Sequence, residues 1–326
     1  MFPRLCSKLF ASGHAEGVEM KASVIISDVN EQGLRLPVVQ MLCNQDFDDY
    51  EVFLASANVF TPEHETMLKD FERQYPHFRM IHAPGGNRAE IINKAVKRAK
   101  GEILCFIESH CIAHRKWVKM YVDLFKSSKV QAAMGTVNTI PASTFMGKAQ
   151  ESKRLDVVDN LGKLGTVKSF FDFHNSAMRR NTFLELGGLS SYIPIMAEFE
   201  LGARFRENGG VLHFLPKSVV WHANDSPFWK YGSVISQQGK EKALILRKHG
   251  REFIEKYFPA PTFLRLLPLL RFFRLPFMFL TKSLVLFGMF GFYIGKAVRS
   301  QHVCNFYFAM FAKNSFRFGL LRGLAG

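Results

Sequence analysis

A carboxylate and an imidazole stand two residues apart directly after a short, wholly apolar run. The run at 103–107 is followed by Glu108, Ser109 and His110. Oxygen and nitrogen ligands at positions i and i+2 of an extended or turning segment can converge on one divalent cation. The spacing therefore indicates a candidate metal site. The same side chains also fit a turn-capping carboxylate followed by a polar surface histidine.

The segments around this pair predict an α/β domain with parallel strands. Five short apolar runs alternate with stretches long enough for helices, and they span residues 23–27, 51–55, 79–82, 103–107 and 131–137. This alternation is typical of βαβ units. The clearest helical pattern covers residues 89–100 and stops at Gly101. Open sheets of this class bind ligands at the carboxyl ends of their strands, where Glu108 is expected to lie.

The composition is that of a folded, basic protein rather than a disordered one. Of the 326 residues, 48% are hydrophobic and 22% are charged, and the net charge of +15 favours anionic partners. Nine Lys or Arg residues and no acidic residue follow Phe263. Because this region is also rich in Phe and Leu, it resembles a membrane-surface segment more than a nucleic-acid-binding one.

The C-terminal region contains a candidate membrane segment. Residues 275–295 carry Lys282 as their single charge, and their number meets the requirement of about 20 residues for crossing a bilayer. Lys282 and the amphipathic stretch 303–324 equally fit a helix that lies on the membrane surface. A hydrophobic hairpin packed on the main domain is the third interpretation.

The N-terminus and the cysteines favour the cytoplasmic face of that membrane. The first twenty residues lack the continuous apolar core of a signal peptide. The five cysteines are scattered without a C-x-x-C pair, which is typical of reduced thiols. We therefore expect a protein attached to the cytoplasmic side, either peripherally or by a single span.

The order of several short motifs resembles family 2 glycosyltransferases, which have the GT-A fold. The matching pieces are 23–26 with Asn30, 45–52, Asn93 with A-K-G-E at 99–102, E-S-H at 108–110 in the Asp-x-Asp position, G-G-L at 187–189, and E-F-E-L-G-A-R at 198–204. Together they span about residues 23–250.

The resemblance implies a fold and a domain organisation. The fold is α/β, with a mixed, mainly parallel sheet flanked by helices and a hydrophobic, basic helical tail. The expected parts are an N-terminal extension at 1–20, a GT-A domain at 21–255 and a membrane-associating tail at 256–326. Within the GT-A domain, 21–138 would be the nucleotide-binding half and 139–255 the acceptor half.

The resemblance also implies an activity of the hexosyltransferase class. A sugar would pass from a nucleotide-diphospho-sugar to a lipid-linked or cell-surface polysaccharide acceptor, with inversion and with help from a metal ion. Glu108, His110 and His222 would hold Mn²⁺ or Mg²⁺, and imidazole ligands favour Mn²⁺ because Mg²⁺ prefers oxygen. His222 beside Trp221 also fits a core histidine.

The same alignment assigns the remaining site residues. Glu198 is the expected catalytic base, whereas Glu200, two positions along the helix, is interpreted as a helix-start carboxylate that can pair with Arg204. The residues expected to contact the donor are Ser27, Asn30, Ser56, Arg88 and Asn93.

Three departures from the family pattern leave a second interpretation open. The second predicted strand ends in A-S-A-N at 55–58, without the acidic residue that reads the nucleobase, and E-S-H replaces Asp-x-Asp. Ala197 stands where a further acidic residue is expected. The alternative is a catalytically silent GT-A scaffold that binds a nucleotide-sugar or a membrane partner.

Overall fold

The computed structural model describes residues 22–28, 36–151, 171–223, 228–257 and 274–324 of the chain. They fall into two compact units. The first, here called the sheet unit, comprises Met1–Asn138 with Lys168–His222, and the second, the helical unit, comprises Thr139–Val167 with Ala223–Gly326. The predicted N-terminal extension at 1–20 lies outside the described residues.

The sheet unit is built on one mixed sheet of eight strands in the order β3-β2-β1-β4-β7-β6-β8-β5. The strands are β1 (Ala22–Asp28), β2 (Tyr50–Ser56), β3 (Phe78–His82), β4 (Ile103–Glu108), β5 (Cys111–Ala113), β6 (Ala132–Ile140), β7 (Ser176–Arg179) and β8 (Leu212–Ala223). The first four in spatial order are parallel, whereas β4–β7, β7–β6 and β8–β5 are antiparallel pairs. The predicted mixed α/β architecture is confirmed.

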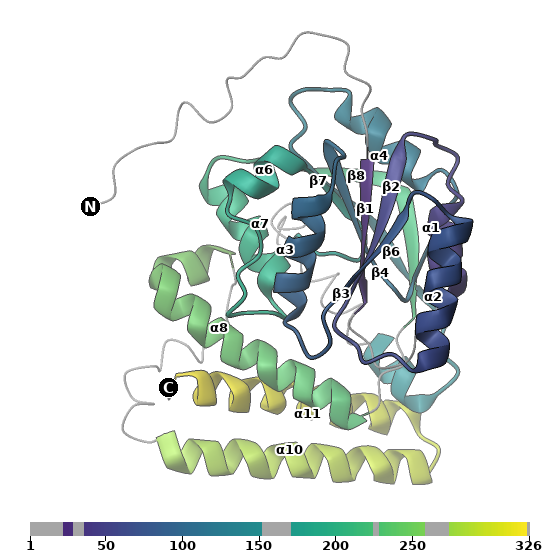
Figure 1. Ribbon diagram of the computed structural model, residues 1–326. Coiled ribbons are helices and arrows are strands. Elements are labelled where there is room, and N and C mark those ends of the chain that lie inside the picture. Colours follow the sequence, from purple (N-terminus) through teal and green to yellow (C-terminus); the bar gives the residue numbers. More distant parts are fainter. Residues whose placement is uncertain (1–21, 29–35, 152–170, 224–227, 258–273, 325–326) are drawn as a thin grey trace. The chain divides into compact units, whose positions relative to one another are not determined.

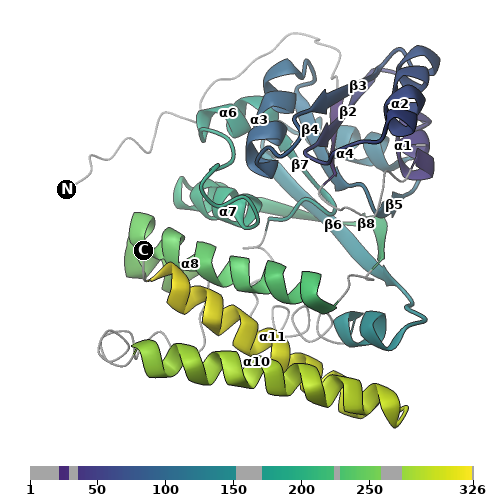
Figure 2. The same cartoon turned by 60° about the horizontal axis from the view of Figure 1, so that its bottom comes forward.

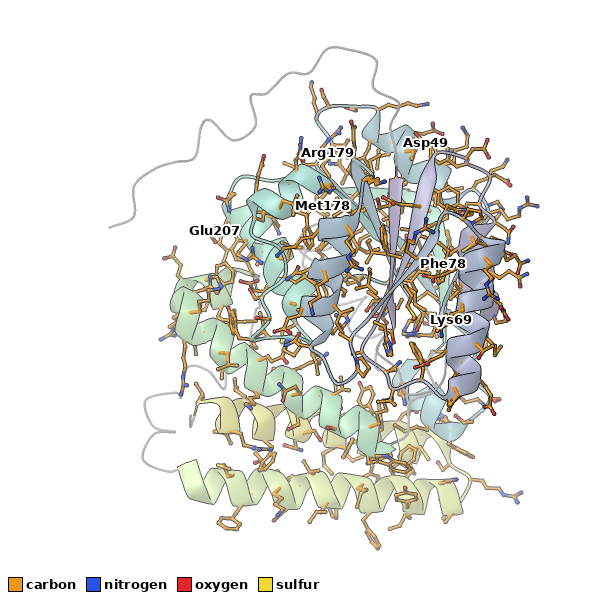
Figure 3. All side chains as sticks on the ribbon, viewed as in Figure 1. Asp49, Lys69, Phe78, Met178, Arg179 and Glu207 are labelled. Carbon is orange, nitrogen blue, oxygen red and sulfur yellow. The ribbon has the colours of Figure 1, made fainter. Side chains whose placement is uncertain are left out.

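Six helices cover the two faces of this sheet. They are α1 (Leu36–Cys43), α2 (Pro62–Gln74), α3 (Arg88–Arg98), α4 (Trp117–Phe125), α6 (Arg180–Glu185) and α7 (Ala197–Glu207). Val24 and Ile26 pack with α1, α2 and α4, whereas Ile25 packs with α3, α6 and α7, because successive strand residues point to opposite faces. Figure 1 shows α2 and α3 on opposite sides of the sheet, and Figure 3 labels Phe78 and Met178, which belong to the two different cores.

The five predicted strands correspond to β1, β2, β3, β4 and β6, and the predicted helix at 89–100 is α3. This helix starts sharply because the Asn87 side chain accepts a hydrogen bond from the backbone N–H of Ala89. Its opening places Arg88 at the carboxyl edge of the sheet, where it bonds to Ser27 at the end of β1.

The described residues of the helical unit include three long helices, α8 (Phe228–Tyr257), α10 (Arg274–Ala297) and α11 (Gln301–Gly323). Figures 1 and 2 show them side by side, with α11 between α8 and α10. Gly250, with φ of 83°, interrupts α8. The predicted segments 275–295 and 303–324 correspond to α10 and α11. The structure groups α8 with these helices, whereas the sequence placed residues up to 255 with the transferase domain.

Candidate active site

Four side chains that can bind a metal converge beyond the end of β4. Glu108, His110, His174 and His222 each offer one ligand atom, and these atoms lie within 4.8 Å of one another. The sheet brings them together from distant parts of the chain. Phe106 pairs with Ser176 across β4 and β7, so that Glu108 and His174 face each other two residues further on, and Cys111 pairs with His222 across β5 and β8.

The side-chain nitrogen and oxygen atoms of this group lie close together. The His110 Nε2 lies 3.2 Å from Glu108 Oε2 and 2.7 Å from His222 Nε2, and the His174 Nε2 lies 3.5 Å from Glu108 Oε2. Adjacent ligands of a four-coordinate ion with bonds of about 2.1 Å are roughly 3.4 Å apart. The two contacts of Glu108 are close to this spacing, whereas the ring nitrogens of His110 and His222 share a hydrogen bond and would have to move apart to bind one ion.

Charge around Glu108 keeps this carboxyl group ionised. Burial raises its pKa, but the nearby His174, His110 and Arg88 outweigh burial and hold the pKa well below the usual range. An ionised carboxylate is the form that binds a metal. Glu108 is thus the anionic member of a group whose other members are imidazoles.

Arg88 connects this group to the predicted base. Its guanidinium donates to Glu198 Oε2 at 2.8 Å, to Glu108 Oε1 at 3.2 Å and to Ser27 Oγ at 3.0 Å. The side chain is 9% exposed and lies over the ring of Phe173. Burial acts against its charge, yet Glu198 and Glu108 raise its pKa, so that one fixed cation lies between two carboxylates.

Glu198 lies in the first turn of α7 and is almost fully buried. Burial raises the pKa of its carboxyl group, and Arg88 opposes this effect without cancelling it. A carboxylate with a raised pKa is a better proton acceptor than an exposed one. Because Glu198 is paired with Arg88 in this structure, its role as a general base stays a prediction.

Glu200 has different partners, as its position two residues further along the helix requires. Its Oε2 accepts from Ser190 Oγ at 2.9 Å and from Arg204 Nε at 2.9 Å, which confirms the predicted pair with Arg204. Arg204 also donates to the carbonyls of Leu186 and Gly188. This pair holds the Gly-Gly turn, where Gly188 has φ of +69°.

The structure brings some of the predicted donor-contacting residues together and separates others. Ser27 and Arg88 lie beside Glu108, whereas Ser56 ends β2 and its Oγ accepts from the N–H of Asn58. Both atoms of the Asn93 side-chain amide bond to the backbone of Leu189, at 2.8 and 2.9 Å. Asn30 lies outside the described residues. Donor contact by these residues stays a prediction.

Sequence reasoning missed His174 and the Asp172 carboxylate beside it. The Asp172 Oδ1 accepts from the backbone N–H of His174 at 3.0 Å and lies 3.4 Å from its Nδ1. A carboxylate behind a metal-binding imidazole fixes the orientation of the ring. In the sequence, His174 stands in the segment F-D-F-H at 171–174. This segment indicates a position beside Glu108 only when β7 is known to pair antiparallel with β4.

Comparisons with known structures identify the fold. A mannosyltransferase from Pyrobaculum calidifontis, solved with GDP-Man and Mn²⁺, superposes with a TM-score of 0.53 at 14% identity over 72% of this chain and 67% of its own. GalNAc-T7 with UDP, GalNAc and Mn²⁺ gives 0.52 at 15% identity over 75% and 55%. S. aureus TarS 1-349 with UDP-GlcNAc gives 0.52 at 11% identity over 92% and 90%. At these identities the likeness establishes the fold.

A comparison with curated proteins finds no significant match. The family model of glycosyl transferase family 2, in contrast, matches residues 23–187, which is half of the chain. The match covers β1 to α6, including Arg88, Glu108, His110 and His174 of the site, and it ends before α7 and β8. The chain belongs to glycosyl transferase family 2 and is a glycosyltransferase with the GT-A fold.

Proposed function

We propose that this glycosyltransferase moves a sugar from a nucleotide-diphospho-sugar to a lipid-linked or cell-surface polysaccharide acceptor, in a metal-dependent and inverting reaction. The observation that carries the proposal is the metal-binding group at the end of β4 beside the Arg88–Glu198 pair. The GDP-Man and UDP-GlcNAc in the superposed structures support a nucleotide-sugar as donor.

Glu108, His110, His174 and His222 would hold the metal ion. When bound, the ion would act as a Lewis acid that neutralises the negative charge of the leaving diphosphate. Three nitrogen ligands favour Mn²⁺ over Mg²⁺, since Mg²⁺ prefers an all-oxygen environment. The Mn²⁺ in two of the superposed structures agrees with this choice.

Arg88 and Glu198 would work in sequence. Arg88 is a bidentate donor, so a diphosphate can replace the two carboxylates as its partner and release Glu198. Glu198 then accepts the proton of the acceptor hydroxyl. The hydroxyl oxygen forms a bond to the anomeric carbon, and the bond from that carbon to the diphosphate oxygen breaks, with the electron pair leaving on the nucleoside diphosphate.

The helical unit supports an acceptor at a membrane. Among the described residues, Met278–Ala297 in α10 is a stretch long and apolar enough to cross a bilayer, by length and composition. The described cysteines, at 43, 105, 111 and 304, are buried thiols, which is compatible with the cytoplasmic face. A membrane-attached enzyme meets lipid-linked acceptors at the surface that carries them.

A catalytically silent scaffold is the second candidate. It is favoured by the ion pairs in which Arg88 neutralises both Glu198 and Glu108. If these pairs persist with a nucleotide-sugar bound, Glu198 cannot accept a proton. Binding without turnover would distinguish this candidate from the enzyme.

A donor screen tests the proposal. We expect one nucleotide-sugar to raise the melting temperature of the full chain in Mn²⁺ but not in EDTA, since a ligand at about 100 times its Kd stabilises a protein by about 2.7 kcal/mol. We also expect slow release of the nucleoside diphosphate from the same mixture. A shift without release in any metal supports the scaffold, and the lack of any shift across UDP-, GDP- and dTDP-sugars contradicts both candidates.

A further inference from the structure

The helix α10 has its apolar residues on the outside. Its outward residues are between 44% and 71% exposed, and they are Phe279, Leu280, Leu286, Phe287, Phe290, Tyr293 and Ile294. The side chains along this helix can be followed in Figure 3. A helix on the surface of a water-soluble protein turns such residues inward and its polar residues outward. The outer face of α10 is therefore built for an apolar environment.

The inward face of α10 consists largely of small residues. A Cβ added at Gly288 would meet the backbone of Phe311 at 2.9 Å, one at Gly291 would meet the Tyr307 ring at 2.2 Å, and one at Gly295 would meet the backbone N of Cys304 at 2.8 Å. These glycines let the backbones of α10 and α11 approach closely, so that most large apolar side chains of α10 lie on the face turned away from α11.

These contacts also fix the antiparallel register of α10 and α11. Gly288 lies against Phe311 and Gly295 against Cys304, so Lys313 lies roughly level with Leu286 in the middle of α10. Lys313 is exposed. If α10 crossed a bilayer, this lysine would lie near the bilayer centre, where an ionised side chain costs about 2.5–3.5 kcal/mol even on the mildest scale. Arg317 would be buried in the membrane with it.

Basic residues border the outer face of α10. Lys282 and Lys296 are exposed within the helix, and Arg299 is exposed just after it. Lys and Arg near an anionic leaflet each contribute about 1 kcal/mol of attraction. The face therefore combines apolar side chains for the acyl region with cations for the headgroups.

We propose that α10 lies in the plane of one leaflet of an anionic bilayer, with its outer face among the acyl chains and Lys282, Lys296 and Arg299 at the headgroups. In this orientation α11 and its Lys313 lie behind α10, outside the hydrocarbon. This inference rests on the membrane association proposed above. Of the two arrangements that the sequence left open, it selects the helix that lies on the membrane surface, and it names the face of α10 that enters the leaflet.

Vesicle binding by the whole chain tests whether a lipid bilayer covers the outer face of α10. We expect the protein to sediment with phosphatidylcholine vesicles that contain about 30% phosphatidylglycerol, and less with pure phosphatidylcholine. Phe287→Asp with Phe290→Asp should weaken binding at least about tenfold, whereas Phe214→Asp, at an exposed aromatic position of the sheet unit, should leave it unchanged. Two results would overturn the proposal. One is vesicle binding by the double variant equal to that of the parent, and the other is a parent protein that forms a stable dimer and does not sediment with vesicles.

The depth of two positions distinguishes in-plane insertion from spanning. Phe279 and Phe290 are eleven residues apart, which is about 16 Å along a helix. A tryptophan is introduced at one position at a time, and the fluorescence of the parent protein is subtracted. Quenching by brominated lipids should then place both tryptophans at the same shallow depth. A position 290 near the bilayer centre together with a position 279 near one surface would show a spanning helix. The donor-dependent shift in melting temperature serves as the separate test of the transferase function, since these substitutions lie outside its site.

Discussion

Replacing Glu198 with glutamine is expected to lower turnover by about 10²–10⁴-fold, the usual contribution of a positioned general base. Glutamine keeps the size of the side chain and an oxygen that can accept from Arg88, but it cannot take up a proton. Donor affinity should therefore change only a few fold. Turnover is measured as nucleoside diphosphate released in the presence of acceptor, and donor affinity by calorimetry.

The pH dependence of turnover separates a base from a merely structural residue. Because burial raises the pKa of Glu198, the free carboxylate is lost, and turnover falls, at a higher pH than for an exposed glutamate. This acid limb should disappear in Glu198→Gln. The matched control is Glu207→Gln at the exposed end of the same helix, labelled in Figure 3, which should keep the parent profile. An unchanged acid limb in Glu198→Gln would exclude Glu198 as the base.

Replacing Glu108 with glutamine is expected to weaken Mn²⁺ binding by on the order of 100-fold or more. Glu108 supplies the negative charge among the four candidate ligands. Even a change to a residue that only hydrogen-bonds to a metal ligand lowers metal affinity about 10–100-fold. Binding is measured without catalysis, from the decrease of the electron paramagnetic resonance signal of free Mn²⁺ during titration of the protein.

Two further variants turn this prediction into a graded series. Asp172→Asn should lower Mn²⁺ affinity about tenfold, because it removes the carboxylate beside His174 but none of the four ligands. His114→Gln changes an exposed histidine four positions beyond His110 and should leave the affinity unchanged. If Glu108→Gln remains folded by circular dichroism and binds Mn²⁺ as the parent does, the ion lies elsewhere.

Much of the sheet could be predicted because each of its central strands is a short apolar run that can be recognised from the sequence of that segment alone. The run that forms β4 is wholly apolar and is followed at once by Glu108, so the strand, its end and the first ligand can be read from one short segment. The different partners of Glu198 and Glu200 were likewise predictable, since the angle between positions i and i+2 is a property of any helix.

His174 could not be predicted, because its place depends on a pairing between distant strands. Nothing in the segment F-D-F-H indicates that the strand after it returns antiparallel beside β4, and a shift of one residue would turn His174 to the other face of the sheet. The three hydrogen bonds of Arg88 are similar: they join it to residues 27, 108 and 198, which only the tertiary structure brings together.

The most direct measurement of the metal centre counts the nitrogen ligands of bound Mn²⁺. Electron spin-echo spectra of the Mn²⁺-loaded protein are expected to show coupling to imidazole nitrogen, to change on ¹⁵N-histidine labelling, and to lose intensity in His174→Ala as one of three rings is removed. Spectra without imidazole coupling, or identical for the parent and His174→Ala, would contradict a centre made of Glu108 and three histidines.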